Sequence, residues 1–316
     1  MLACIAPAAA QPLHKPPADF PRKPIRLIVP FAPGGNTDFL ARIISQKLAE
    51  SWGQQVITDN RPGAGGSVAG EMTARAAPDG YTLLMISITN SIAATLHPGL
   101  PYDVVRDFAP LVLLGMTPQV LLAHPSLPVK SVRELVAFAK ARPGKLSYAS
   151  AGTGGGTHLT GELLKQVAGL DIVHIPYKGG GPALIDLVGG QVDLQVTGLV
   201  SALPFIKSKR ANPLAVTGAR RSPAAPDIAS MAESGLPEVD ANSWYGLVAP
   251  AATPREIIGQ LNGEIARILA VPDLRARLAA DGAEAGGGTP EQFGAYIKAE
   301  IAKWARVIRL AHIRAQ

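Results

Sequence analysis

Two short stretches of the sequence place a glycine-rich turn between an apolar run and the start of a predicted helix. They read IVPFAPGGNTDFLAR, from residue 28, and YASAGTGGGTHLTGE, from residue 148. Glycine lets the backbone approach a ligand closely, and the first N–H groups of a helix are unpaired donors at the positive end of its dipole. Two such ends facing each other would bind a carboxylate without any arginine. Either turn alone is equally compatible with an ordinary connection, but one in each half of the chain favours binding.

Several polar side chains beside these turns are candidate ligand contacts, and each has a structural alternative. Thr37, Thr153 and Thr157 carry hydroxyl groups that would donate to a ligand or cap their helices. Asp38 is either a ligand contact or an acidic residue that the helix dipole favours in a first turn. His158 opens a predicted helix, where its neutral ring is able to donate a hydrogen bond or to serve a structural role.

Further candidates follow the later predicted strands. Tyr177 and Lys178 precede three glycines at a strand end, where they would contact the distal part of a ligand, although Lys178 is also compatible with a plain surface charge. Thr197 and Gly198 end the next strand and would line the same cleft. Asn90, after the strand TLLMIS, is a weaker candidate.

The usual signatures of enzymes and metal sites are absent from the sequence. It contains no H-E-x-x-H motif and no paired cysteines, and its six histidines are widely spaced. Counting G-x-G-x-x-G from Gly63 reaches Val68, and counting from Gly152 reaches Thr157, so neither stretch is a dinucleotide fingerprint. GGSVA is one residue short of a nucleophile elbow. We therefore predict a protein without covalent chemistry, cofactor or metal, and keep an exported hydrolase acting through Ser67 or His158 as the alternative.

Composition and charge indicate a globular protein outside the classes that bind nucleic acid or span a membrane. The net charge of +6 comes from scattered basic residues, and aromatic residues make up only 5%, so no basic and aromatic stripe for nucleic acid is present. The sole cysteine, Cys4, lies in MLACIAPAAAQP, which ends like a signal-peptidase site. We expect the remnant of an export signal and a leader over residues 1 to 22, with lipoprotein acylation of Cys4 as an open alternative.

The order of predicted elements indicates an α/β fold in two lobes. Strand and helix signals alternate over the first hundred residues, as in a parallel sheet covered by helices. Two apolar runs separated by a predicted Thr-Pro turn follow near residues 109 to 129, and the second glycine-rich unit then repeats the opening design. The chain is expected to cross between lobes near residues 118 to 124 and 244 to 249. Lobe 1 would comprise residues 23 to 119 and 248 to 316, and lobe 2 residues 120 to 247.

Six ordered motifs resemble a known family: VPFAPGGNTDFLAR, NRPGAGGSVAGE, APDGYTLL, SYASAGTGGGTHLTGE, IPYKGGGPALIDLVGGQVD and WYGLVAPAATP. The chain is similar to the Bug family, the extracytoplasmic solute-binding proteins of tripartite tricarboxylate transporters. The resemblance covers almost the whole chain from about residue 23. It implies a periplasmic, monomeric, two-lobed Venus-flytrap protein of the type II binding-protein kind. It also implies a function in uptake or sensing, no enzymatic activity and membrane permease subunits as partners.

The resemblance further implies that a small carboxylate is held between the lobes by the loops after the first strand and in the second lobe. Amino acids, di- or tricarboxylates and aromatic acids all remain open as ligands. Members of the family often carry a hydroxyl residue where this chain has Gly155, so Thr153 or Thr157 would substitute. The motif residues thus expected at the site are Phe31, Pro33, Gly34, Gly35, Asn36, Thr37, Asp38, Ser150, Ala151, Gly152, Thr153, Gly154, Gly155, Thr157 and His158.

Overall fold

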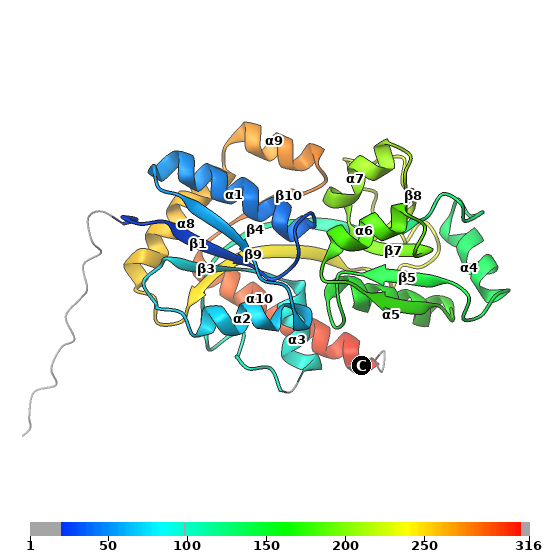
Figure 1. Ribbon diagram of the computed structural model, residues 1–316, viewed down its shortest axis with the longest axis horizontal. Coiled ribbons are helices and arrows are strands. Elements are labelled where there is room, and N and C mark those ends of the chain that lie inside the picture. The colour runs from blue at the N-terminus through cyan, green and yellow to red at the C-terminus, as the bar shows by residue number, and fades with distance from the viewer. Residues whose placement is uncertain (1–19, 98, 311–316) are drawn as a thin grey trace, which may run out of the picture.

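Strands and helices alternate along most of the chain in the computed structural model, which describes residues 20–97 and 99–310 (Figure 1). The predicted export signal and leader lie almost wholly outside the described residues. In chain order the elements are β1 (Ile25–Val29), α1 (Asn36–Trp52), β2 (Val56–Asn60), η1 (Ala64–Gly66), α2 (Ser67–Ala74), β3 (Thr82–Ser87), α3 (Ile88–Leu96), β4 (Phe108–Ala123), α4 (Val132–Lys140), β5 (Ser147–Ser150), α5 (Gly156–Ala168), β6 (Val173–Pro176), α6 (Gly180–Val188), β7 (Leu194–Gly198), α7 (Leu199–Lys207), β8 (Asn212–Val216), β9 (Asn242–Pro250), α8 (Arg255–Leu269), α9 (Pro272–Ala280), β10 (Glu284–Gly287) and α10 (Pro290–Leu310).

The strands form two groups that share one long strand. In the order β2-β1-β3-β9-β4-β7-β5-β6, the pairs around β1 and around β5 are parallel, whereas β9 and β4 run antiparallel to their neighbours. Strand β10 pairs with the middle of β4, at residues 113–116, and β8 pairs with its last residues, 120–123. We call the part built on β1 to β3, β9, β10 and the start of β4 lobe 1, and the part built on β5 to β8 and the end of β4 lobe 2 (Figure 1).

The predicted turn at Thr117 and Pro118 is wrong, because β4 continues through both residues as one strand of 16 residues. Pro118 is opposite Asn242 of β9, and the next residue, Gln119, is opposite Gly198 of β7. Proline lacks the N–H that a strand interior needs. It is tolerated here because the strand changes partners at this point, and the same residues carry the chain from lobe 1 into lobe 2.

The return crossing lies earlier than the predicted residues 244 to 249. Strand β9 pairs along its length with β3 and β4 of lobe 1, so the chain has returned by Asn242. We therefore propose that lobe 2 ends near residue 241. The two crossing segments lie side by side, because Pro118 of β4 pairs with Asn242 at the start of β9. We propose that they act as a hinge between the lobes.

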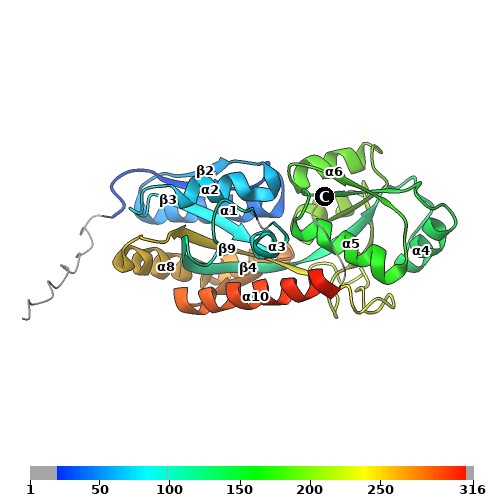
Figure 2. The same ribbon diagram turned by 90° about the horizontal axis from the view of Figure 1, so that it is seen from below.

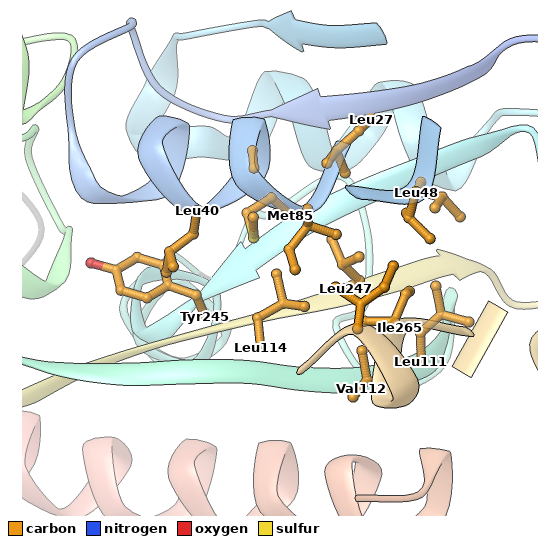
Figure 3. Packing of buried hydrophobic residues seen from close by; sticks show 14 of the residues in the cluster. Leu27, Leu40, Leu48, Met85, Leu111, Val112, Leu114, Tyr245, Leu247 and Ile265 are labelled. Carbon is orange, nitrogen blue, oxygen red and sulfur yellow. The ribbon is translucent and has the colours of Figure 1, made fainter. Parts of the chain in front are cut away.

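Each lobe is a three-layer sandwich with a hydrophobic core on both faces of its sheet. In lobe 1, Leu27, Met85 and Leu247 from three strands pack against Leu40 of α1 and Ile265 of α8 (Figure 3). The opposite face packs against α2, α3 and α10, and Figure 2 shows α10 lying along the sheet. In lobe 2, α4 and α5 cover one face while α6 and α7 cover the other. None of the described helices is long and apolar enough to cross a membrane.

A buried carboxylate fixes the last helix to lobe 1. Glu300 of α10 is 8% exposed, and its Oε2 atom accepts hydrogen bonds from the indole Nε1 atoms of Trp244, at 2.9 Å, and Trp304, at 3.2 Å. Both indoles are almost fully buried, so each N–H needs this acceptor. The terminal helix thus packs against one face of the lobe 1 sheet.

Replacing Glu300 with leucine should destabilise the protein by about 2–6 kcal/mol, because two buried indole N–H groups lose their acceptor at about 1–3 kcal/mol each. Glu300→Gln keeps an acceptor oxygen at the same place and should lose less. The free energy of unfolding measured by urea denaturation, followed by circular dichroism, tests this. Equal losses for the two variants would show that the acceptor is not what stabilises the helix.

Candidate functional site

The first glycine-rich loop, residues 30–35, connects β1 to α1 and is held in shape from behind by Asp38. The carboxylate of Asp38 accepts hydrogen bonds from Gly34 N at 3.1 Å, Arg42 Nε at 2.9 Å and Asn60 Nδ2 at 3.0 Å. Burial alone would raise the pKa of Asp38, but these donors outweigh it and hold the pKa below its ordinary value. Gly34 has φ +89°, a left-handed conformation that favours glycine. Asp38 therefore fixes the shape of the loop from behind.

The second glycine-rich loop, residues 151–155, connects β5 to α5 and is supported by two stacked histidines. Gly154 N donates to Nδ1 of His158 at 3.1 Å, and the Ser150 hydroxyl is 2.7 Å from Nε2 of His174. The two imidazole rings stack with centroids 4.0 Å apart. Because His158 is only 1% exposed and its Nδ1 accepts a hydrogen bond, it holds the loop in place as a neutral ring.

Both histidines are held neutral by their surroundings. Burial lowers the pKa of His158, and burial is the main cause that lowers the pKa of His174 to about 4. The neighbouring charged groups are Glu162, 4.0 Å from Nε2 of His158, and Lys165, which pairs with Glu162 at 2.9 Å. At neutral pH the support behind the second loop is therefore uncharged.

Five helices begin at a small cavity between the lobes, which we call the inner pocket. The N-cap or first residues of α1, α3, α5, α6 and α7 all line it, and its volume is about 50 Å³. In full, its lining is Phe31, Gly35, Asn36, Thr37, Ser87, Ile88, Thr89, Ala151, Gly155, Gly156, Thr157, Gly180, Thr197, Gly198, Ser243 and Tyr245. None of these lining residues is charged, so the local field comes from backbone N–H groups and helix dipoles.

Several side chains of the inner pocket carry a hydrogen-bond donor that has no acceptor among the described residues. Asn36 is 6% exposed, and its Nδ2 has no hydrogen-bond partner among the described residues. The hydroxyl oxygens of Thr89 and Thr157 accept backbone hydrogen bonds from Gly156 and Ala151, which leaves their protons available to a ligand. Such donors, together with the helix ends, are complementary to an anion.

Tyr245 adds a phenolic donor to the inner pocket. It lies at the edge of the lobe 1 core, and Figure 3 shows its oxygen pointing away from the leucines. Burial raises the pKa of the Tyr245 phenol to about 12, so it carries its proton at neutral pH.

A larger cavity, which we call the outer chamber, adjoins the inner pocket at Phe31 and Ala151, two residues that line both. Its volume is about 760 Å³. Its walls come from both lobes: Phe31, Gly63, Ala64, Gly65, Gly66, Ser67, Val68, Glu71, Leu96, His97, Gly99, Leu100 and Pro101 on one side, and Ala151, Gly152, Thr153, Pro176, Tyr177 and Lys178 on the other. Small-molecule ligands commonly bind in a cleft between two domains.

The lobes touch along the cleft through direct hydrogen bonds. Ala32 N donates to the carbonyl oxygen of Lys178 at 2.9 Å, and Ser201 N donates to Oδ1 of Asn36 at 2.9 Å. Gly156 N donates to Oγ1 of Thr89 at 3.3 Å. Asn36 thus joins the lobes with its oxygen, while its nitrogen has no partner among the described residues.

Glycines let the two lobes come this close. A Cβ on Gly181 would lie 2.3 Å from the carbonyl oxygen of Pro33, and one on Gly35 would lie 3.5 Å from Gly180 N. A Cβ on Gly198 would fall 1.8 Å from Nδ2 of Asn36. The glycines of α6 and β7 therefore leave room for the first loop of the opposite lobe.

The structure brings most of the predicted site residues together. Those at the inner pocket are Phe31, Gly35, Asn36, Thr37, Ala151, Gly155, Thr157, Thr197 and Gly198, and those at the outer chamber are Gly152, Thr153, Tyr177 and Lys178, with Phe31 and Ala151 again. Thr157 lines the same inner pocket as Gly155, which has no hydroxyl of its own. Thr153 lines the outer chamber instead.

Seven predicted residues line neither cavity: Pro33, Gly34, Asp38, Asn90, Ser150, Gly154 and His158. Pro33 and Gly34 pack against Gly181 of the other lobe. Asn90 completes the capping box of α3 with Ser87 and donates to the hydroxyl of Tyr102 at 3.3 Å. These residues shape and support the loops, which is a positioning role and not a direct contact.

Sequence reasoning missed part of the inner pocket, namely Ser87, Ile88, Thr89, Gly156, Gly180, Ser243 and Tyr245. Thr89 is next to the predicted Asn90 at the start of α3, and it is Thr89 that lines the inner pocket. Ser243 and Tyr245 alternate along β9, a pattern that also fits an ordinary buried strand. Among the described residues, no group of three His, Cys, Asp or Glu side chains could hold a metal ion.

The fold and the cleft define a two-lobed periplasmic solute-binding protein. The family model for the tripartite tricarboxylate transporter family receptor matches residues 40–313, and the chain belongs to this family. The chain is 40% identical over 292 residues to Protein BugT of Bordetella pertussis, covering 92% of this chain and 90% of BugT. Because this is a receptor family, the protein binds a solute and is not an enzyme.

Two solved structures carry ligands in the same fold. A protein of Rhodopseudomonas palustris solved with adipate superposes with a TM-score of 0.91 at 37% identity, covering 94% of this chain and 99% of the other. MatC of Rhodopseudomonas palustris, solved with bound malate, superposes with a TM-score of 0.87 at 34% identity, covering 92% of this chain and 100% of the other. The predicted fold class and family are confirmed.

Gly181→Ala should weaken ligand binding at least tenfold with little effect on the stability of either lobe, because the new Cβ meets the Pro33 oxygen only when the lobes touch. Small-angle scattering should show a more extended protein. Gly263→Ala, whose Cβ would meet nothing within 4 Å, is the control. Unchanged binding by Gly181→Ala would mean that this contact does not govern closure.

The stability of the protein should fall between pH 7 and pH 4.5 in a way that depends on His174. The unfolded chain takes up a proton near the ordinary histidine pKa of about 6.5, whereas folded His174 does so only near its pKa of about 4. Stability is therefore present above pH 6.5 and is lost as the pH falls. His174→Phe, which keeps a stacked ring, should lose about 2 kcal/mol less over this range. Parallel stability curves for the two proteins would contradict this assignment.

Proposed function

We propose that the inner pocket binds a carboxylate group of a small organic acid and that the lobes close on this ligand. The observation that carries the proposal is the convergence of five helix N-termini on a cavity whose lining holds no charged side chain. Backbone N–H groups at helix ends bind anions without a formal positive charge. Relatives solved with adipate and malate support the same ligand class.

The carboxylate would lie between Asn36, Thr89 and Thr157. Each of these residues supplies a donor that its own hydrogen bonds leave free. Because Asn36 and Thr89 belong to lobe 1 and Thr157 to lobe 2, one bound carboxylate would join both lobes. Binding energy would thereby shift the protein toward the closed arrangement.

We further infer that the protein works as a monomer after removal of an export signal and that the closed form delivers its ligand to membrane permease subunits. The family membership supports this placement. The predicted hydrolase alternative finds no such support, because the Ser67 hydroxyl donates to the carbonyl oxygen of Ala64 at 2.8 Å and His158 is buried behind the second loop.

Purified protein should show a saturable rise in melting temperature with small carboxylates and no rise with the corresponding carboxamides. A ligand at a hundredfold excess over its dissociation constant adds about 2.7 kcal/mol of stability. The ligand should be recovered chemically intact after incubation. Conversion of the ligand would instead indicate an enzyme. Carboxamides that bind as tightly as the acids would show that the bound group need not be an anion.

Asn36→Asp should reduce carboxylate affinity at least tenfold. The substitution keeps an oxygen for Ser201 N but replaces the free Nδ2 donor with a negative charge beside the ligand. Asn212→Asp, which makes the same charge change at the start of β8, is the matched control and should bind normally. Isothermal titration calorimetry of both variants measures the difference, and equal affinities would place the carboxylate elsewhere.

A further inference from the structure

A third cavity, which we call the distal cavity, lies in lobe 1 and shares no lining residue with the inner pocket or the outer chamber. Figures 1 and 2 show α8, one of its walls, at the end of lobe 1 that points away from lobe 2. Its volume of about 710 Å³ is within the range of about 300–1,000 Å³ that is usual for small-molecule sites. In full, its lining is Val104, Val105, Ala109, Pro110, Ala251, Thr253, Arg255, Ile258, Gly259, Pro290, Glu291, Gly294, Ala295, Ile297 and Lys298.

Most of the distal cavity is apolar. All but four of its lining residues are glycine or carry apolar side chains. Ile258 of α8 and Ile297 of α10 are buried at its base, whereas Val105, in the segment before β4, stays 43% exposed. A hydrocarbon chain bound here would cover this surface, and each methylene group that it buries would strengthen binding by about fourfold.

The charged residues of the lining leave a surplus of positive charge. Arg255 and Lys298 are exposed, and neither makes an ion pair with any described residue. Glu291 is the one acidic residue of the lining. Its own backbone N–H and the Thr289 side chain hold the pKa of its carboxyl below the ordinary value, and the charge of Arg255 contributes to this. Two cations therefore accompany one carboxylate that already has donors, and this combination favours an anionic ligand.

The start of α8 adds donors that the described residues leave unused. Pro254 is the N-cap residue, and no side chain caps this helix of 15 residues. In α10, by contrast, the Thr289 hydroxyl accepts a hydrogen bond from Gln292 N at 3.3 Å. Thr253 lines the distal cavity and is 6% exposed, yet its hydroxyl has no hydrogen-bond partner among the described residues. Buried polar groups are normally paired, and an anion at this helix start would supply the partner.

We propose that the distal cavity is a second ligand site, separate from the cleft, for an amphipathic acid with one anionic group and an apolar chain. The anionic group lies at the start of α8, beside Thr253 and Arg255. The chain lies against Val105, Ile258 and Ile297. A free acid in solution and an anionic lipid in a membrane share this chemistry.

Calorimetric titration with decanoate, hexanoate and 1-decanol tests the ligand chemistry. The titrations use the Asn36→Asp protein, whose cleft should bind carboxylates weakly, so that the distal cavity is observed by itself. Decanoate should bind at least tenfold more tightly than hexanoate, because it buries more methylene groups. It should also bind at least tenfold more tightly than 1-decanol, which has the same chain but no charge. Decanol that binds as tightly as decanoate would overturn the assignment.

Gly259 of α8 offers a variant that blocks the distal cavity. It lines the cavity, and a Cβ added there would meet nothing within 4 Å, so Gly259→Phe places its ring where the ligand chain would lie. Gly263→Phe, one turn further along α8, is the matched control, because its Cβ also meets nothing within 4 Å and it does not line the cavity. Gly259→Phe should weaken decanoate binding at least tenfold, and Gly263→Phe less than twofold. Equal affinities would place decanoate elsewhere and overturn the proposal.

Thr253→Val separates a ligand contact from a structural role. Valine keeps the shape of threonine without the hydroxyl, so the free protein loses no hydrogen bond among the described residues and should melt at the same temperature or higher. Its affinity for decanoate should nevertheless fall at least threefold. Arg255→Met should also weaken decanoate at least threefold, whereas Arg275→Met, on α9 and away from the cavity, should not. Unchanged affinity in both Thr253→Val and Arg255→Met would overturn the placement of the anion.

Binding to lipid vesicles distinguishes the two sources of the ligand. Cosedimentation with phosphatidylcholine vesicles that contain phosphatidylglycerol, lost in Gly259→Phe but kept in Gly263→Phe, would identify a membrane lipid. Decanoate binding without such cosedimentation would identify a free acid. If neither decanoate nor the vesicles bind, the second site is overturned. The cleft is tested independently, because Gly259→Phe should leave the binding of adipate and malate by the otherwise unsubstituted protein unchanged.

Discussion

The convergence of helix starts on one small cavity is the constraint on which the rest of this site depends. Every helix leaves its first donors without an internal partner, and here five helices begin around one small cavity. The α/β topology produces this arrangement, since strands that run parallel end at one edge of a sheet and the following helices start there. β1 and β5 supply one such edge to each lobe, and the pairing of β4 with β9 lets the two edges face each other.

Bringing two backbone loops together requires positions without side chains. Gly35 and Gly180 lie at van der Waals distance across the cleft, and Gly181 has room for nothing more than hydrogen beside Pro33. Side-chain support is placed behind the loops instead: Asp38 holds the first, and the stacked pair of His158 and His174 holds the second. Both loops are thus held by buried groups that line neither cavity.

The sequence allows the loops to be predicted but only part of the pocket. The two strand-glycine-helix units are local patterns, and they include Asn36 and Thr157, which line the inner pocket. Asp38 and His158 have the same local signature as ligand contacts, because a polar residue at a helix start serves equally well to fix a loop. Only their hydrogen bonds, to Gly34 and Gly154, show which role they have.

Tyr245 and the path of β4 depend on pairing between strands that are far apart in the sequence, which local sequence patterns do not encode. Tyr245 reaches the inner pocket because β9 lies beside β3 and β4, which is a pairing of residues far apart in the chain. The Thr-Pro pair in β4 has the composition of a turn, yet it is where one strand passes between two sheets.

Dividing the cleft into two cavities separates affinity from specificity in physical terms. The inner pocket combines helix starts with the side-chain donors of Asn36, Thr89 and Thr157, a set that the proposed function has any carboxylate satisfy. The outer chamber is lined by side chains such as Val68, Leu100 and Lys178, whose size and charge are free to vary without disturbing the loops. Under the proposed function, a fold built in this way would keep one anion-binding site, while the side chains of the outer chamber would be free to change with the rest of the ligand.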